Sequence, residues 1–345
     1  MIKFLTIYFG LVTFFAAAQT SPFNGLEIEN DSTGNYKFIV SGHFYGNSSN
    51  GTGYPVNTIL GNINHFNSSN SDFFICLGDL FLDVSNDIPF YKKTLFSDLD
   101  IPLFNTVGNH DVSGSIYEDN FGERTNIFVF NQDCHIIIDT EIDNGNLEQE
   151  QIDLLLNAKS MAEKGEIKNL FVYGHRTLWV EHYAEMDGLF EDNTQSLTGN
   201  NFGSEIIPIL EEIGEHCSVH WFAGSLGNAP ASFFYHFDEA RNIKYIATAV
   251  RGLPRDAVLY VESNNGAISF STESLTGQDL NNLEDYNTAF WQENTDTAPP
   301  FNWRLVPLYI KNAVFNRYFW YGFLAFLGLL IVGKPIIKRF KKSNS

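Results

Sequence analysis

Several short polar motifs in this chain each come directly after an apolar, strand-like segment. They combine glycine with histidine, aspartate, asparagine or serine, and in chain order they are Ser41-Gly42-His43, Gly78-Asp79, Gly108-Asn109-His110-Asp111, Gly174-His175 and Gly224-Ser225-Leu226-Gly227. In layered α/β domains, side chains at the carboxyl ends of strands converge on one crevice, where such folds bind their ligands. Aspartate, asparagine and neutral histidine are ligands for hard or borderline metal ions, and glycine lets the backbone turn sharply beside them. The pattern therefore predicts an α/β domain with a candidate metal site at one edge of its strands.

The order of these motifs resembles that of the calcineurin-like metallophosphoesterase family. The family pattern is D-x-H, then G-D, then G-N-H-[DE], then a lone H, then G-H-x-H, and the likeness covers about residues 35 to 272. The second and third motifs match without change, and Gly174-His175 fits the lone-histidine motif. The resemblance implies a four-layer α/β/β/α metallophosphoesterase-like sandwich and, in intact members, a dinuclear metal centre that hydrolyses phosphoesters.

The first and last motifs depart from the family pattern. Ser41 stands where the first motif has aspartate, and Ser225 and Gly227 stand where the last motif has two histidines, so three of the seven expected metal ligands are missing. The resemblance leaves His43 and Asp79 for the first metal, and Asp79, Asn109 and His175 for the second. A metal with three protein ligands and open positions can be catalytic, whereas a two-ligand site is poor. We therefore expect at most one divalent ion (Mn, Fe or Zn).

His110 and Asp111 are the expected catalytic residues. By the resemblance, His110 lies beside the scissile ester and donates a proton to the leaving group, and Asp111 orients its ring. Each motif residue also has a plain structural interpretation. Asp79 could cap the segment that follows it, Asn109 could hold a turn, and His43 could be a buried histidine bonded to backbone.

Two functions are consistent with this damaged site. The first is a membrane-anchored, extracytoplasmic phosphoesterase that cleaves a phosphoester substrate with a single metal ion. The second is a non-catalytic pseudophosphoesterase that serves as an envelope binding or assembly protein and captures a protein partner. Because three of the expected ligands are missing, the sequence favours the second function over phosphoester hydrolysis at a full rate.

The strand and helix pattern predicts one domain over residues 19–276. A helix is expected over residues 147–164, between strands at 136–139 and 168–173. After Gly224 the pattern becomes β-rich, and we expect the runs 232–237, 244–250, 257–261 and 267–270 to form a coherent second sheet. Asn264-Asn265-Gly266 predicts a hairpin turn between the last two runs. His220 lies inside an apolar strand and is expected to be a packed core histidine.

Both ends of the chain predict export and anchoring. Residues 1–18 read as a signal peptide with Gln19 as the mature start, an uncleaved anchor being the alternative. Residues 277–312 form a polar stalk or strap, residues 313–337 a transmembrane helix, and residues 338–345 a basic cytoplasmic tail. An interfacial helix and a cleaved sorting tail are the alternatives for the last segments. The domain is therefore expected outside the membrane and the C-terminus in the cytoplasm.

The net charge limits the kinds of molecule that this chain can bind. Without Lys3 and the five basic residues from Lys334 onward, 15 basic residues face 41 acidic ones, a net charge of about −26. Such a surface repels nucleic acid, so no nucleic-acid partner is expected.

The chain has three cysteines, an odd number for an exported protein, namely Cys76, Cys134 and Cys217. We expect buried free thiols, with one disulfide as the alternative.

Overall fold

The computed structural model describes residues 19–28, 34–190, 199–226, 229–294, 314 and 319–326, without the side chain of Asn144. The predicted signal peptide (1–18), the basic tail (338–345) and most of the predicted transmembrane segment (313–337) lie outside the described residues. Among the described helices, none has the length and apolarity that crossing a bilayer requires.

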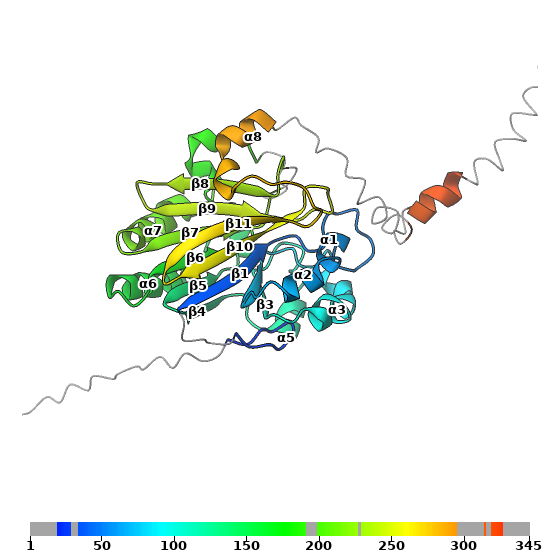
Figure 1. Ribbon diagram of the computed structural model, residues 1–345, viewed down its shortest axis with the longest axis horizontal. Helices are drawn as coiled ribbons and strands as arrows, with labels where there is room; N and C mark the ends of the chain where they lie inside the picture. Colours follow the sequence, from blue (N-terminus) through cyan, green and yellow to red (C-terminus); the bar gives the residue numbers. More distant parts are fainter. Residues whose placement is uncertain are drawn as a thin grey trace, which may run out of the picture.

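Two β-sheets form the centre of the described chain (Figure 1). The first sheet has the strand order β11-β10-β1-β2-β3, with parallel pairing of β1 with β2 and of β2 with β3, and antiparallel pairing of β10 with both β1 and β11. Its strands are β1 (Asn35–Ser41), β2 (Phe73–Cys76), β3 (Leu103–Asn105), β10 (Ala257–Asn264) and β11 (Ala267–Ser274). The parallel strands β1, β2 and β3 therefore end at the same edge of the sheet.

The second sheet has the order β4-β5-β6-β7-β9-β8, with β5, β6, β7 and β9 parallel and the edge strands β4 and β8 antiparallel. Its strands are β4 (Asn126–Phe130), β5 (Asp133–Ile137), β6 (Asn169–Tyr173), β7 (Ser218–Ala223), β8 (Phe233–Asp238) and β9 (Ile243–Thr248). The strands expected around residues 136 and 170 are β5 and β6.

The four C-terminal strands do not form a sheet of their own, so that expectation was wrong. β8 and β9 extend the sheet that contains β7, whereas β10 and β11 extend the sheet that contains β1. The predicted hairpin is confirmed, because Asn265 and Gly266 join β10 to β11 with φ of 54° and 90°. Positive φ at both central residues is the requirement of a tight two-residue hairpin turn. The pairing partner of each hairpin depends on tertiary packing, which local periodicity does not encode.

Helices cover the outer faces of both sheets (Figure 1). The first sheet packs against α1 (Asn57–Leu60), α2 (Ile63–Asn67), α3 (Val84–Lys92), α4 (Leu95–Asp98) and α5 (Ile116–Phe121). The second packs against α6 (Gln149–Glu163), the helix expected at 147–164, and against α7 (Ile207–Gly214). Short helical turns are η1 (Ile142–Gly145), η2 (Val180–His182), η3 (Ala184–Met186), η4 (Phe202–Ile206) and η5 (Leu283–Asp285).

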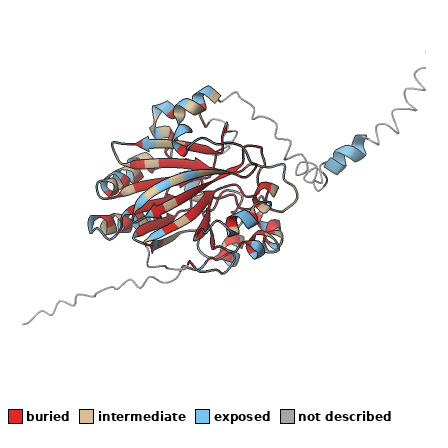
Figure 2. Cartoon of the chain, in the orientation of Figure 1, coloured by how far each residue is buried: buried red, intermediate tan, exposed pale blue. Residues whose placement is uncertain are grey.

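The two sheets pack face to face through an aromatic core. Phe38 and Phe73 of the first sheet and Phe171 and Phe222 of the second are fully buried in the same cluster. Figure 2 shows the strands as mostly buried. His220 is buried among them, with its ring 4.9 Å from that of Phe171, which confirms the expected core histidine. This packing fixes the ends of the strands relative to one another.

The segment after β11 returns to the domain surface. α8 (Thr288–Asn294) places Trp291 against the second sheet, where only 1% of this residue is exposed. Its indole Nε1 donates a hydrogen bond of 2.9 Å to the carbonyl of Phe233, and its ring stacks on Phe190. Residues 277–294 thus lie on the domain as a packed strap.

Candidate metal centre

Loops after four strands meet at one edge of the sandwich. His43 follows β1, Asp79 follows β2, residues 108–111 follow β3, and His175 follows β6. Backbone hydrogen bonds tie these loops together, from His43 N to Gly78 O (2.9 Å) and from Gly224 N to His175 O (3.0 Å). The loops of both sheets therefore hold their side chains in fixed positions around Asp79.

Two of the predicted ligands, His43 and His175, lie against a carboxylate oxygen of a third, Asp79. Oδ2 of Asp79 lies 3.5 Å from Nδ1 of His43 and 3.6 Å from Nε2 of His175. All three ligand atoms lie within 4.8 Å of one another. Ligands at the usual 2.0–2.2 Å from a tetrahedral ion lie about 3.4 Å apart, so these spacings fit a shared ion.

The unpartnered nitrogen atoms of the two histidines agree with this fit. Nδ1 of His175 lies 2.8 Å from the carbonyl of Leu77, which directs Nε2 toward Asp79. That Nε2 and both ring nitrogens of His43 are buried without a hydrogen-bond partner. The absence of a partner alone does not identify a ligand, since both ring nitrogens of the core residue His220 are also unpartnered. The distinguishing feature of His175 is that one nitrogen contacts a backbone carbonyl while the other lies against a carboxylate, the usual arrangement behind a metal. Two imidazoles and a carboxylate suit zinc, manganese or iron.

The pKa values of the two histidines are shifted in opposite directions. Burial lowers the pKa of His43 well below its ordinary value, and the positive charge of Arg251 lowers it further. His43 is therefore neutral, as a metal ligand must be. Burial also opposes protonation of His175, but the carboxylates of Asp79 and Glu141 outweigh it and raise the pKa of His175.

The backbone at the centre is strained and closely packed. His43 has φ of 57° and Asp79 has φ of 55°, a region sparsely populated by residues other than glycine. Such conformations cost about 1–3 kcal/mol each and cluster at functional sites. Gly108 lies so close that a β-carbon there would be 2.5 Å from the backbone nitrogen of Asp79. Only glycine allows this loop to approach the aspartate.

Asn109 and His110 belong to the loop after β3 that adjoins this group. Asn109 is exposed, although the sequence predicted it as a ligand together with Asp79 and His175. His110 is half-buried, and its backbone N–H donates to Oδ1 of Asp79 at 3.2 Å. Nδ1 of His110 lies 2.9 Å from the carbonyl of Leu82, which leaves Nε2 as its other protonatable atom. The structure thus brings His43 together with Asp79 and His175, and the role of Asn109 as a ligand stays a prediction.

Asp111 does not orient the ring of His110, so that part of the expectation was wrong. Its buried carboxylate accepts hydrogen bonds from the backbone N–H groups of Leu80, Phe81 and Gly108 at 2.9–3.2 Å. Burial and the nearby charge of Asp79 raise the pKa of Asp111 to about 6. Asp111 therefore joins the loops after β2 and β3, and the carbonyl of Leu82 is the group in contact with the His110 ring. Loop N–H groups without a partner in a helix or strand need another acceptor, and this carboxylate provides it. The motif in the sequence does not reveal that role.

The altered motif positions are also near the centre. Ser41 is fully buried and its hydroxyl has no hydrogen-bond partner, and Ser225 is buried with its N–H donating to the carbonyl of His175. Gly227 lies outside the described residues. Among the described residues, the expectation of buried free thiols is confirmed, since all three cysteines are buried and unbridged.

Tyr45 belongs to the centre and was missed by the motif analysis. Its hydroxyl lies 3.4 Å from Oδ2 of Asp79, and its ring centroid lies 5.4 Å from that of His43 and 5.1 Å from that of His110. Burial, followed by the charge of Asp79, raises the pKa of Tyr45 far above its ordinary value, so the phenol is a hydrogen-bond donor. Its only sequence signal is an aromatic residue two positions after the motif histidine.

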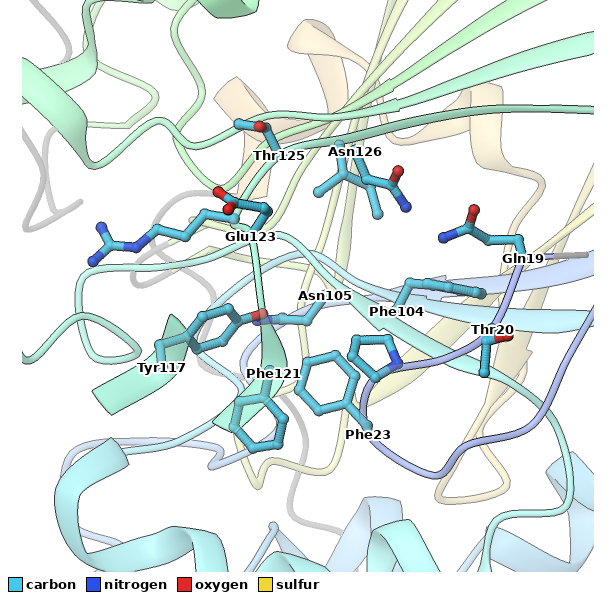
Figure 3. Close-up of a pocket in the computed structure, with 13 residues that line it drawn as sticks. Gln19, Thr20, Phe23, Phe104, Asn105, Tyr117, Phe121, Glu123, Thr125 and Asn126 are labelled. Carbon is cyan, nitrogen blue, oxygen red and sulfur yellow. The ribbon is translucent and has the colours of Figure 1, made fainter. Parts of the chain in front are cut away.

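A separate cavity of about 270 Å³ lies behind β3 (Figure 3). Phe23, Phe104 and Phe121 contribute aromatic rings to its lining. Asn105 separates it from the metal centre, because its side-chain amide donates to Tyr117 Oη on the cavity side and to Asp111 Oδ2 on the other. Asn105 therefore links the lining of this cavity to Asp111.

A second buried polar cluster lies between the sheets. Tyr36 donates to Oδ2 of Asp133 at 2.9 Å, and its hydroxyl lies 3.0 Å from Nε2 of His135. Asn169 and Ser263 also donate to the Asp133 carboxylate. This carboxylate has several neutral donors, so the cluster is a satisfied buried network rather than an open site.

Comparisons with known proteins give weak likenesses. No family model and no curated protein matches the sequence. Among solved structures, GAP50, the anchor in the inner membrane complex of Plasmodium, is 13% identical with a TM-score of 0.48, and the match covers 77% of this chain and 95% of that one. A purple acid phosphatase, PPD1 from yellow lupin seeds, is 8% identical with a TM-score of 0.45, covering 77% and 54%. A cold-active protein tyrosine phosphatase is 12% identical with a TM-score of 0.28, covering 70% and 80%. At these values the function has to be argued from the geometry of the site.

Proposed function

We propose that this protein is a metallophosphoesterase-like protein that binds one divalent cation between His43, Asp79 and His175. The observation that carries the proposal is a pair of buried, unpartnered imidazole nitrogens, Nδ1 of His43 and Nε2 of His175, which lie 3.5 Å and 3.6 Å from one carboxylate oxygen of Asp79. A buried nitrogen without a partner costs about 1–3 kcal/mol, and a bound cation removes this cost. The absence of a carboxylate at Ser41 argues against a second cation in the same centre, because less negative charge is present to hold two dications together.

In the catalytic form of the proposal, each residue has a defined task. The bound cation would act as a Lewis acid on a phosphoryl oxygen. His43 and His175 hold their nitrogens toward the cation, and Tyr45 offers its hydroxyl next to Asp79. Water would attack phosphorus as the bond to the leaving oxygen breaks, and His110 in its imidazolium form would donate the Nε2 proton to that oxygen while Nδ1 stays in contact with the Leu82 carbonyl. Asp111 keeps the loops after β2 and β3 together.

The experiment that tests the cation is a metal analysis of the purified chain. The protein is dialysed against trace manganese, iron and zinc, and its metal content is compared with that of His175→Ala. We expect close to one ion per chain, lost in the variant and retained in His65→Ala, a control at an exposed histidine. If neither the wild type nor the control holds metal, the proposed centre is wrong.

Turnover decides between the two functions. The metal-loaded protein is assayed with p-nitrophenyl phosphate and bis(p-nitrophenyl) phosphate, beside His110→Ala. Hydrolysis that falls about 100-fold or more in His110→Ala supports the single-metal phosphoesterase. A metal-loaded protein without turnover supports the second candidate, a non-catalytic envelope binding protein. The missing ligands at positions 41, 225 and 227 and the exposed position of Asn109 favour this second candidate.

We also propose that the protein is exported and anchored by the segment 313–337. Support comes from the large apolar side chains that are exposed in the described part of this segment, namely Phe319, Trp320, Tyr321, Phe323, Leu324 and Phe326. Exposed apolar side chains of this density favour contact with lipid or protein. Cell fractionation tests the anchor, since deletion of residues 313–345 should move the protein from the membrane pellet to the soluble fraction. A pellet-bound deletion variant would contradict it.

A further inference from the structure

Arg251 is fastened to the segment that carries His43. It follows β9, and the neighbouring Val250 N–H donates to the carbonyl of Gly42 at 3.0 Å. The N–H of Arg251 donates to Oδ1 of Asp256, and its carbonyl accepts from Nδ2 of Asn47, both at 2.9 Å. Hydrogen bonds to Gly42 and Asn47, which precede and follow His43 in the sequence, therefore fix the backbone position of Arg251.

The guanidinium group of Arg251 has no hydrogen bond or ion pair within the described part of the chain. Every other arginine in that part uses its guanidinium, since Arg124 pairs with Asp139, Arg176 with Glu141, and Arg241 with Asp238. Arg255 donates to the carbonyl of Ala231. The chain has a net charge of −20, yet no carboxylate in its described part pairs with this half-buried arginine. A group of this kind is poised to bind an anion.

The backbone of Arg251 lies beside the loop that carries His43. Asn47 is hydrogen-bonded to Arg251 and Gly42 to Val250, so both ends of this loop are in contact with the Arg251 segment. Tyr45 lies in the same loop, with its ring centroid 5.4 Å from that of His43 and 5.1 Å from that of His110.

We propose that Arg251 binds the non-bridging oxygens of a phosphoryl group next to the single cation, and so supplies the positive charge that a second metal ion would otherwise give. A guanidinium presents two parallel N–H donors that match two oxygens of a tetrahedral oxyanion. Fixed positive charge beside His43 also repels a second dication. The ligand class is a phosphate ester or free phosphate. This inference rests on the proposed function, because the same crevice must hold the cation.

The test measures two affinities on the full-length protein. Titration calorimetry gives the Kd of zinc, and then the Kd of inorganic phosphate with and without one equivalent of zinc. The variants are Arg251→Gln, Arg251→Lys and Lys164→Gln, the last removing one positive charge from the exposed end of α6. Circular dichroism checks that each variant is folded.

Arg251→Gln is expected to change the phosphate affinity and the zinc affinity in opposite directions. Arg251→Gln should weaken phosphate binding about 10- to 100-fold, as expected for loss of charged hydrogen bonds. It should at the same time tighten zinc binding a few-fold, because a repelling charge is gone. Arg251→Lys should retain part of the phosphate affinity, since lysine is a point charge without the fork. Lys164→Gln should change neither affinity.

Other outcomes separate this inference from the proposed function. Phosphate affinity within about twofold of wild type in Arg251→Gln, or no phosphate binding by the wild type, overturns the inference. A parallel loss of zinc and phosphate affinity would assign Arg251 a purely structural role and overturn it too. If the wild type binds no zinc but its phosphate binding depends on Arg251, the metal centre is wrong and the anion site stands.

Discussion

Replacing Gly108 by alanine should disable the metal centre while leaving the fold intact. The added β-carbon would touch Oδ1 of Asp79 and lie 2.5 Å from its backbone nitrogen and 2.9 Å from Cγ. Carbon atoms need about 3.5 Å to avoid repulsion, so the loop and Asp79 must separate by about 1 Å. Because Asp79 supplies the carboxylate shared by His43 and His175, that displacement changes both ligand spacings.

The magnitude follows from the size of the displacement. Overpacking of this kind costs about 1–3 kcal/mol of unfolding free energy, which for a domain of this size lowers Tm by about 2–12 °C. Functional side chains have to be held within about 0.5 Å, and errors of 1 Å cost about 100-fold. We therefore expect the zinc affinity of Gly108→Ala to fall about 100-fold or more, measured by calorimetric titration alongside thermal unfolding.

Gly114→Ala is the matched control, six residues further along the same loop region. Gly114 has φ of 58°, and a β-carbon there would meet nothing within 4 Å. This variant should lose about 1 kcal/mol from the left-handed conformation and keep its zinc affinity. Wild-type zinc affinity in Gly108→Ala would refute the packing argument, as would an equal loss of affinity in Gly114→Ala.

Two further predictions concern the fold. Trp291→Ala removes a fully buried indole and leaves the Phe233 carbonyl without its donor, so it should lower the free energy of unfolding in denaturant by about 3–5 kcal/mol. The control Leu156→Ala, at an exposed helix position, should lower it by less than about 0.5 kcal/mol. An unfolding midpoint of Trp291→Ala equal to that of the wild type would mean that the strap is not packed. Tyr36→Phe removes a donor to Asp133, whose pKa burial already raises, so the variant should lose about 1.5–3 kcal/mol when this carboxyl is ionised. Because a raised folded-state pKa disfavours the ionised form, this loss should be present at pH 7 and shrink as the pH falls and Asp133 is protonated, and a pH-independent loss would contradict the assignment.

The sequence by itself determined the local parts of this protein. Glycine next to a polar residue after an apolar run placed His43, Asp79 and His175 at strand ends, because parallel strands end at one edge of a sheet. The Asn265-Gly266 turn was readable because positive φ at two successive residues restricts the residue types. The helix at residues 149–163 followed from its apolar periodicity.

Only the tertiary structure decided which of these parts meet. The pairing of β10 with β1 assigned the last hairpin to the first sheet, and no local pattern encodes a partner that lies over 200 residues away. Histidines from two different sheets share one oxygen of Asp79, whereas the adjacent Asn109 is exposed. The segment of Arg251 is held beside the loop of His43 by hydrogen bonds from Val250 N to Gly42 O and from Asn47 Nδ2 to Arg251 O, across more than 200 residues of sequence. Such contacts depend on sheet packing and on the satisfaction of buried polar groups, which are properties of the whole fold.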